Sequence, residues 1–266
     1  MKLSVLMPVY NECATLREIL RRVGDVPVEK EIVIVDNCST DGTRQLLQDM
    51  LARGEAVPGE ADPGEADRGE ADAEQATVNE TVLRVILQER NNGKGSSVRR
   101  ALAAARGEWI IVQDADLEYD PQDYLKLLCA AQKWEASPGR QGQDVAVFGT
   151  RLSRGSLARR NQLQDAFLLG RIGLSIAFRV LYATSLSDVA TCYKLMRRRV
   201  AQSLDLQADG FDLDFEIAAR LRRRGVRIVE VPISYQPRGK GEGKKIRALQ
   251  DGSSALWTLL KYRCIR

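Results

Sequence analysis

The first half of the chain repeats one pattern: a short apolar run, a turn rich in acids or glycine, and then apolar residues at helical spacing. The pattern occurs at 3–23, at 31–51 and at 82–105. Short apolar runs bounded by turn residues favour buried strands, and strands that alternate with helices favour parallel pairing. We therefore predict an α/β fold built on a mostly parallel sheet with helices on both faces.

The remaining elements are expected from the same periodicities. Besides the strands at 3–9, 31–35 and 82–88, we expect strands at 109–112, 144–149 and 227–235, and a strand-and-turn segment at 188–197. Later helices are expected at 98–105, 123–134, 163–182, 211–223 and 248–262. Thr15 is a candidate cap of the first helix, and Ser39 or Thr40 of the second. At 266 residues the chain suits one large domain or two small ones.

The stretch from Trp109 to Glu118 ends an apolar run in two carboxylates. Asp114 and Asp116 are two positions apart, so in an extended chain they point to the same side. They then lie at the carboxyl edge of the sheet, where open α/β sheets bind ligands. Two close carboxylates favour a cation between them, and a hard divalent ion that also binds phosphate oxygens fits. The alternative is an ordinary acidic turn before the next helix.

Polar turns also follow the other expected strands. Glu12 and Asp36 follow the first two, and Gly93-Lys94-Gly95 follows the third. Because the carboxyl ends of parallel strands share one edge, these turns converge with Asp114 and Asp116 on one crevice. A surface turn explains each of them singly, but together they indicate a nucleotide-binding crevice. The glycines around Lys94 do not form a P-loop, because the required spacing is absent.

The composition excludes several mechanisms. The chain has no histidine, which rules out histidine acid–base catalysis and histidine-activated nucleophiles. The five cysteines are widely spaced and form no CxxC pair, which indicates reduced thiols in a cytosolic protein. No apolar run reaches the roughly 18 residues of a membrane-spanning helix. The first residues do not have the features of a signal peptide.

Charge is unevenly distributed along the chain. Residues 55–80 hold nine acids and one base, a net charge of −8, which leaves +12 for the rest of a chain whose total is +4. A five-residue motif repeats three times at 59–73, and this period suits neither a helix nor a strand. We predict that 55–80 is a disordered acidic insertion in a surface loop. The basic remainder indicates an anionic partner, such as nucleotide phosphates, a phosphorylated lipid, a membrane surface or nucleic acid.

Two segments of the second half carry scattered cations. The apolar region at 163–182 is interrupted by arginines, which suits a helix on a membrane surface. It equally suits a packed helix whose arginine stems reach water. The segment at 238–246 is rich in glycine and cations. It suits either a lid over a diphosphate or a solvated basic loop.

Taken in order, these motifs resemble those of the family 2 glycosyltransferases. They are Pro8-Val-Tyr-Asn-Glu12, Asp36-Asn-Cys-Ser-Thr-Asp-Gly-Thr43, Gly93-Lys-Gly95, Asp114-Ala-Asp116 and Gly149-Thr-Arg151. The second half resembles the polyprenyl-phosphate hexosyltransferases of the dolichol-phosphate mannose synthase type. Its motifs are Asp188-Val-Ala-Thr-Cys-Tyr-Lys194, Phe211-Asp-Leu-Asp-Phe-Glu216, and Arg238 ahead of Lys244-Lys-Ile246. The resemblance covers nearly the whole chain except the acidic repeat.

The resemblance implies a single domain with the Rossmann-like fold of the glycosyltransferase A type. Its nucleotide-sugar-binding half would span about 1–151, and its acceptor and lid half about 152–266. It implies a Mg²⁺ or Mn²⁺ ion with Asp116, Asp114 and Glu118 as candidate ligands, Glu118 standing where relatives often have Gln. The residues implied in donor binding are Pro8, Tyr10, Glu12, Ile34, Asp36, Lys94, Asp114, Ala115, Asp116, Arg151, Arg238 and Lys244.

The implied reaction is an inverting transfer of mannose or glucose from GDP-mannose or UDP-glucose to a dolichyl or undecaprenyl phosphate. Arg151 would meet a donor or acceptor phosphate, Arg238 and Lys244 would close over the donor, and Asp188 would act as a base or position the sugar. A phosphate acceptor is already ionised at neutral pH, so the absence of histidine is no obstacle. The protein would be cytoplasmic and peripheral to the cytoplasmic face of a membrane, held by its own surface or by a membrane-anchoring partner.

Three other functions compete with this one. The acceptor could instead be a saccharide or small metabolite, since Phe167, Arg171 and Ala190 depart from the relatives where acceptor recognition is expected. A nucleotidyltransferase would need a glycine-rich signature near the first strand, which Tyr10-Asn-Glu12 does not provide. Unclustered arginines and few exposed-looking aromatics argue against a nucleic-acid partner.

Overall fold

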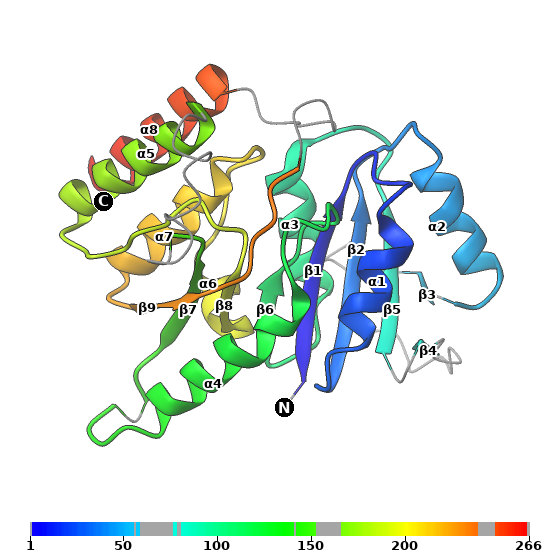
Figure 1. Cartoon of the computed structure of the whole chain (residues 1–266), viewed down its shortest axis with the longest axis horizontal. Coiled ribbons are helices and arrows are strands. Elements are labelled where there is room, and N and C mark those ends of the chain that lie inside the picture. The colour runs from blue at the N-terminus through cyan, green and yellow to red at the C-terminus, as the bar shows by residue number, and fades with distance from the viewer. Residues whose placement is uncertain are drawn as a thin grey trace.

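One mixed sheet organises the part of the chain that the computed structural model describes, residues 2–55, 57–58, 77–78, 81–140, 142–152, 166–238 and 248–264 (Figure 1). Its nine strands are β1 (Leu3–Val9), β2 (Lys30–Asp36), β3 (Val57–Pro58), β4 (Thr77–Val78), β5 (Thr81–Leu87), β6 (Trp109–Val112), β7 (Val145–Thr150), β8 (Lys194–Arg197) and β9 (Arg227–Pro232). The order is β3-β5-β2-β1-β6-β8-β7-β9, with β4 paired to β5. Only β4 and β8 pair in the antiparallel direction, so the predicted mostly parallel sheet is confirmed.

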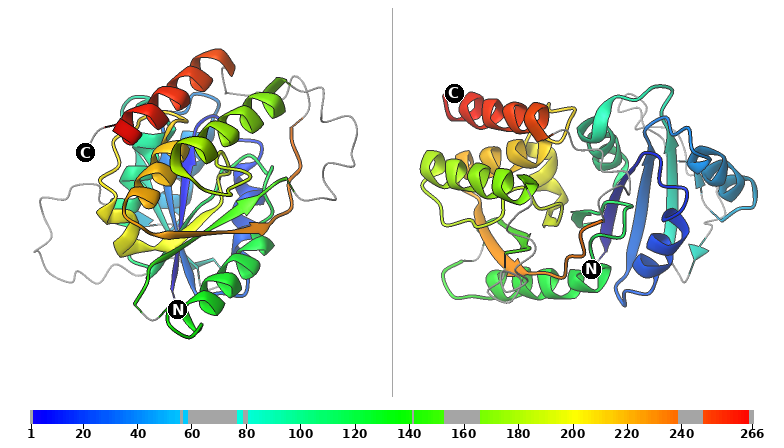
Figure 2. Two further views of the ribbon diagram at one scale, coloured as in Figure 1. Left: turned by 90° about the vertical axis from the view of Figure 1, so that its left-hand side faces the viewer. Right: turned by 45° about the horizontal axis from the view of Figure 1, so that its top comes forward.

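Helices cover both faces of the sheet, as predicted (Figures 1 and 2). They are α1 (Leu16–Gly24), α2 (Thr43–Ala52), α3 (Gly93–Ala104), α4 (Tyr124–Glu135), α5 (Ala166–Tyr182), α6 (Arg198–Ser203), α7 (Leu213–Arg223) and α8 (Ala248–Cys264), with a 3₁₀ turn at Pro121–Asp123. Helices α3, α6 and α7 lie on one face, and α1 and α4 on the other. Helices α5 and α8 lie side by side as an outer layer next to α7.

The middle of the sheet brings three strand ends together. Strand β1 pairs in parallel with β2 on one side and with β6 on the other. In this register Val9 lies opposite Asp36, and Leu6 lies opposite Val112. The chain winds outward in opposite directions from β1, which makes this a topological switch point. Open α/β sheets bind ligands at such a point, outside the carboxyl ends of the strands.

These central strands are buried on both faces because helices cover each side. Every residue of β2 and β6 is buried, which explains why the runs at 32–35 and 109–112 are continuously apolar rather than alternating. Glu31, the second residue of β2, is also buried, and its carboxylate accepts hydrogen bonds from the Ser4 hydroxyl and the Gly107 amide. Arg84 on β5 adds an ion pair at 3.2 Å. The buried charge is therefore stabilised by several donors.

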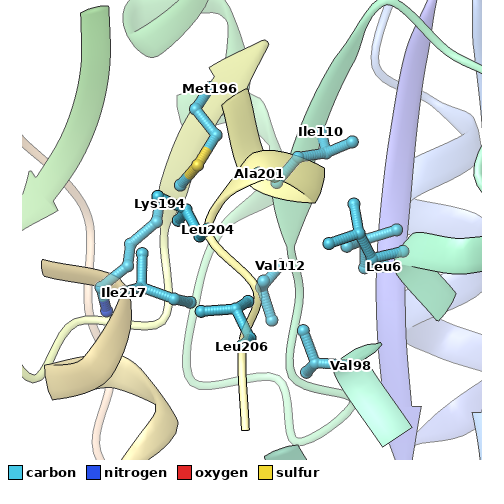
Figure 3. A pocket seen from close by; sticks show the side chains of 11 residues that line it. Leu6, Val98, Ile110, Val112, Lys194, Met196, Ala201, Leu204, Leu206 and Ile217 are labelled. Carbon is cyan, nitrogen blue, oxygen red and sulfur yellow. The ribbon is translucent and has the colours of Figure 1, made fainter. Parts of the chain in front are cut away.

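A small apolar pocket lies between the sheet and helices α3, α6 and α7 (Figure 3). Its lining comes from β1, β6, β8, these three helices and the loop after α6, and includes Leu6, Val98, Val112, Met196, Leu206 and Ile217. Lys194 contributes its aliphatic stem, while its ammonium donates to Asp214 Oδ1 at 2.6 Å. Because the rest of the lining is apolar, the pocket is a gap in core packing and offers nothing to a charged ligand.

Two helix starts differ from the prediction. Helix α3 begins at Gly93 rather than at 98, so the glycines form its first turn. A Cβ on Gly95 would lie 2.2 Å from the Ala208 carbonyl oxygen, so these glycines allow the backbone of 208–209 to approach. The prediction that Ser39 or Thr40 caps the second helix is wrong. Helix α2 begins at Thr43, whose amide donates to Asp41 Oδ1 at 3.0 Å.

Two further predictions concern Thr15 and the acidic insertion. Thr15 occupies the N-cap position of α1, but its hydroxyl donates to the Glu12 carboxylate rather than capping the helix. Within the predicted acidic insertion, β3 and β4 both pair with β5. The repeat at 59–73 lies outside the described residues, so its predicted disorder stays a prediction.

Candidate active site

The turns after β1, β2 and β6 each contain a non-glycine residue in the left-handed backbone region. These residues are Asn11 with φ 51°, Cys38 with φ 63° and Leu117 with φ 63°. Such conformations are uncommon for residues with a side chain, and they concentrate at functional sites. The first two turns are also joined, because the Asn11 amide donates to the Ser39 hydroxyl at 2.9 Å. The strand ends therefore carry their acidic side chains on fixed turns.

Arg238 connects two of these strand ends. Its Nη2 donates to Glu12 Oε2 at 2.6 Å, and its Nε donates to the Asp116 carbonyl oxygen at 3.2 Å. Glu12 follows β1, Asp116 follows β6, and Arg238 follows β9. Residues far apart in the sequence thus meet at the switch point of the sheet. The turns of Glu12 and Asp116 therefore lie close together, as their positions at one sheet edge predicted.

Glu118 holds the segment that carries Arg238. Its Oε1 accepts from the Arg238 amide at 3.0 Å, and its Oε2 accepts from the Tyr235 hydroxyl at 2.7 Å. The Glu118 carbonyl oxygen accepts from the Gln236 amide at 2.9 Å. Both carboxylate oxygens of this predicted metal ligand therefore take part in protein contacts.

Asp114 forms an ion pair with Lys94 from the first turn of α3. The Lys94 Nζ lies 2.7 Å from Asp114 Oδ1 and 3.0 Å from Oδ2. Although burial opposes ionisation, the Lys94 ammonium holds the pKa of Asp114 below its usual value. The Lys94 ammonium lies over the ring of Phe211, just before α7, at 5.6 Å from the ring centre. Lys94 therefore keeps Asp114 ionised and fixed in place.

Asp116 has an electrostatic environment that favours a cation. Burial, followed by the nearby charges of Asp114 and Glu118, raises the pKa of Asp116 to about 7. A divalent cation would relieve this repulsion, and carboxylate oxygens are the ligands that Mg²⁺ and Mn²⁺ accept. Among the described residues, no three acidic, cysteine or histidine side chains gather closely enough to hold an ion alone. The site thus fits a metal that takes further ligands from phosphate or water.

Asp36 is buried at the end of β2 and is held by Arg44. The Arg44 Nη1 lies 3.0 Å from Asp36 Oδ2 and donates also to the Gln88 carbonyl oxygen at 2.6 Å. The Ser39 amide donates to the same carboxylate at 3.2 Å. This is the turn geometry that the sequence offered as the alternative to nucleoside binding. Asp36 therefore shapes its turn, and its predicted role in nucleoside binding stays a prediction.

Arg151 and Asp188 form a buried ion pair beside the crevice. Arg151 Nε and Nη2 donate to the two carboxylate oxygens at 2.7 and 2.8 Å, and the Arg151 amide donates at 3.1 Å. The Arg151 Nη1 donates to the Tyr119 hydroxyl at 2.9 Å. Despite burial, Asp188 raises the pKa of Arg151 well above its usual value. The geometry gives Asp188 the role of orienting Arg151.

The other predicted residues are placed less directly. Ile34 and Ala115 are buried in the core, so their side chains do not line an open surface. Pro8 and Tyr10 are partly buried at the end of β1. Lys244 lies outside the described residues. Of the departures from the relatives, Ala190 is partly buried, and the side chains of Phe167 and Arg171 are not described.

Sequence reasoning missed Tyr119, Tyr235 and Arg44. Tyr119 accepts from both Arg151 and the Cys192 amide, and its ring lies 5.3 Å from that of Tyr235. Both tyrosines lie in short segments after strands, where no local signal distinguishes them from core aromatics. Arg44 sits in an ordinary helical pattern, and only the fold brings it to Asp36.

The outer helices expose apolar side chains. Among the described residues the exposed large hydrophobic side chains are Leu125 on α4, Ile176 and Val180 on α5, and Leu256, Trp257 and Leu260 on α8. Val180 is 77% exposed and Trp257 66%. Phe178 of α5 is fully buried, so this helix is both packed and partly exposed. No helix in the described part of the chain combines the length and apolar character needed to cross a bilayer.

Proteins of known activity are similar to this chain along most of its length. Glycosyltransferase AglJ of Haloferax volcanii is 24% identical over 252 residues, which cover 93% of this chain and 67% of that protein. Dolichol-phosphate mannosyltransferase of Pyrococcus furiosus is 26% identical over 252 residues, which cover 92% of this chain. The match spans 59% of the length of the Pyrococcus protein.

Solved structures show the same fold. Glucosyl-3-phosphoglycerate synthase from Mycobacterium tuberculosis, in complex with uridine diphosphate, superposes with a TM-score of 0.59 at 18% identity. The superposition covers all of this chain and 81% of that one. The predicted glycosyltransferase A type fold is therefore confirmed. The model of the family "Glycosyl transferase family 2" matches residues 4–57 and 61–204. The chain therefore belongs to glycosyl transferase family 2, as the order of its motifs predicted.

Proposed function

We propose that this protein transfers mannose or glucose from a nucleoside-diphosphate sugar to a polyprenyl phosphate, with inversion at the anomeric carbon. The main support for a donor site is the position of Arg238. Its guanidinium lies between Glu12 and the main chain of Asp116 at the switch point of the sheet. A cationic fork next to a partly buried carboxylate suits a diphosphate bound to a metal.

The cation, Mg²⁺ or Mn²⁺, fits at Asp116, with Asp114 beside the donor's sugar or ribose. When bound, it neutralises charge on the diphosphate leaving group. Lys94 holds Asp114 ionised, so the Asp114 carboxylate can accept hydrogen bonds from sugar or ribose hydroxyls. Arg238 adds a second positive charge to the leaving group. Lys244, which follows in the sequence, is proposed to assist it.

The acceptor is proposed from the names of the relatives and from Arg151. Dolichol-phosphate mannosyltransferase of Pyrococcus furiosus carries a lipid phosphate in its name. In this chain Arg151 is fixed by Asp188 and Tyr119, so it is preorganised to contact a phosphate. One phosphate oxygen attacks the anomeric carbon, the bond to the diphosphate breaks, and the nucleoside diphosphate leaves. The acceptor oxygen is already anionic, so no proton has to be removed.

A lipid acceptor requires contact with a membrane, and helices α5 and α8 suit this role. Ile176, Val180, Leu256, Trp257 and Leu260 are exposed on these adjacent helices. Arg179 and Arg263 are exposed on the same pair, and α5 contains no acidic residue. Apolar and cationic side chains together favour the surface of an anionic bilayer. We propose that this face rests on the cytoplasmic leaflet.

The transfer is tested by the partition of label between phases. Purified protein, Mn²⁺, a short polyprenyl phosphate and either radiolabelled GDP-mannose or UDP-glucose are incubated, and the mixture is extracted with organic solvent. Label in the lipid phase is the expected result with one of the two donors. Label that stays in water, on a saccharide or small metabolite added as acceptor, would assign a soluble acceptor instead.

A further inference from the structure

We propose that Glu118 and Tyr235 are positioning residues that hold Arg238 across the donor crevice, and that Glu118 serves this purpose rather than ligating the cation. The segment from 233 to 238 follows the edge strand β9 and brings Arg238 to Glu12 and Asp116, which follow the central strands β1 and β6. This proposal rests on the proposed function only in assigning the donor diphosphate to Arg238. The attachment of the segment itself is visible in the structure.

Glu118 contacts this segment through three separate hydrogen bonds. Its two carboxylate oxygens accept from the Tyr235 hydroxyl and the Arg238 amide, and its carbonyl oxygen accepts from the Gln236 amide. A bridge between Tyr119 and Tyr235 pairs the two segments in the antiparallel direction. The attachment therefore resembles a short piece of sheet, completed by the Glu118 side chain.

Neighbouring contacts make this attachment rigid. The Ser234 amide donates to Asp123 Oδ2, a buried carboxylate at the start of α4. The Tyr235 ring packs edge-on against the Tyr119 ring, with centroids 5.3 Å apart. The Arg151 guanidinium lies 5.1 Å from the centre of the Tyr235 ring. Tyr235 therefore links the segment both to the core and to the proposed acceptor arginine.

The attachment decides where the Arg238 guanidinium lies. With its amide fixed on Glu118, Arg238 reaches the Asp116 carbonyl oxygen and Glu12 Oε2. An arginine that is held in place before the donor arrives loses little side-chain entropy on binding. More of the free energy of its contact with the diphosphate is therefore retained as binding affinity. A carboxylate occupied in this way has less freedom to turn toward a metal ion.

Trypsin cleavage after Arg238 tests the attachment without reference to activity. Glu118→Ala and Tyr235→Phe are expected to speed cleavage of the Arg238–Gly239 bond severalfold, followed by mass spectrometry. Glu118→Gln is expected to cleave at the wild-type rate, because its amide oxygen still accepts from Arg238 and its amide nitrogen can donate to the Tyr235 oxygen. Cleavage after Arg220, inside α7, reports global unfolding and should stay slow. Unchanged cleavage after Arg238 in Glu118→Ala would overturn the proposal.

A Mn²⁺ titration distinguishes the two roles of Glu118. In the lipid-phase transfer assay, Glu118→Ala and Tyr235→Phe should both raise the donor KM about tenfold at saturating Mn²⁺. Glu118→Gln should have the donor KM of the wild-type protein. The Mn²⁺ concentration for half-maximal rate should stay within about twofold of wild type in all three. A tenfold higher Mn²⁺ requirement in Glu118→Ala but not in Tyr235→Phe would assign Glu118 to the metal and reject our inference.

A control variant and the independence of the trypsin assay from activity separate this inference from the proposed function. Tyr262→Phe removes a hydroxyl of α8 that donates to Glu216 and accepts from Arg220. Neither residue bonds Glu118 or Arg238, so this variant should leave both the cleavage after Arg238 and the donor KM unchanged. If no donor supports transfer, the proposed function fails. The trypsin result would still decide whether Glu118 holds Arg238.

Discussion

Arg151 and Asp188 form a bidentate ion pair that leaves only 7% of the arginine side chain and none of the aspartate exposed. The pair joins the end of β7 to the segment before β8, beside the crevice. Both carboxylate oxygens face the guanidinium. A carboxylate in this arrangement is stabilised as an anion and is poorly suited to take a proton.

Asp188→Asn should therefore destabilise the protein. Removing one partner of a buried ion pair leaves the other charge uncompensated, which costs about 3–5 kcal/mol. Urea denaturation should show a loss of this order in the free energy of unfolding. Asp205→Asn, at an exposed aspartate, is the matched control and should change little. Loss of transfer with unchanged stability would instead indicate that Asp188 acts on the substrate.

Lys94→Met should weaken donor binding. The variant removes the ammonium that bonds Asp114 at 2.7 Å while keeping the length of the side chain. Hydrogen bonds to charged groups contribute about 1.5–3 kcal/mol, so kcat/KM should fall roughly tenfold to a hundredfold. Arg99→Met is the control on the same helix, because Arg99 bonds the carbonyl oxygens of Gln207 and Ala208 and the carboxylate of Asp209, none of which belongs to the crevice. An equal loss in both variants would assign the effect of Lys94 to helix packing.

The dependence of stability on pH should reflect Glu31. Burial opposes its ionisation, but hydrogen bonds from Ser4 and the Arg106 amide, together with Arg84, lower the pKa of Glu31 below its usual value. A lowered pKa contributes stability above the pKa of the unfolded chain, and this is lost as pH falls through the folded value. Glu31→Gln should be less stable at pH 7, and its stability should fall less between about pH 5 and pH 3. This would be contradicted if the free energy of unfolding of Glu31→Gln and of the wild-type protein changed with pH by the same amount.

The outer helices should bind anionic vesicles. Trp257→Ser and Val180→Ser each remove an exposed apolar side chain, and burying such a side chain contributes about 1.5–3 kcal/mol. Each variant should therefore bind phosphatidylserine-containing vesicles roughly tenfold more weakly in a sedimentation assay. Leu125→Ser is the matched control, because Leu125 is exposed on α4, on the opposite face of the sheet. Equal losses in all three variants would argue against a specific membrane face.

The sequence was sufficient to predict the strands that are buried on both faces. The runs at 3–9 and 109–112 became β1 and β6 with the expected bounds, because periodicity reports burial directly. Residues without a local pattern could not be predicted in this way. Helix α6 has only six residues, and β3 and β4 have two each, too few for periodicity to be read.

The candidate site could be predicted where its residues follow the ends of strands. It could not be predicted where it depends on contacts between residues far apart in the sequence. Glu12, Asp114 and Asp116 follow apolar runs, so one rule about sheet edges places them together. The contacts of Arg238 could not be read from the sequence, because its Glu12 partner lies 226 positions away. The use of Glu118 as an anchor depends in the same way on Tyr235, 117 positions away.

The most direct test of our account compares Asp116→Asn with the wild-type protein in the lipid-phase label assay. A metal on the leaving group supplies several kcal/mol, so the variant should transfer label at least about a hundredfold more slowly while its thermal unfolding stays cooperative. The wild-type protein should move label into the lipid phase with one nucleotide sugar and stop when the metal is chelated. Transfer by Asp116→Asn at the wild-type rate, or wild-type transfer unaffected by chelation, would contradict the account.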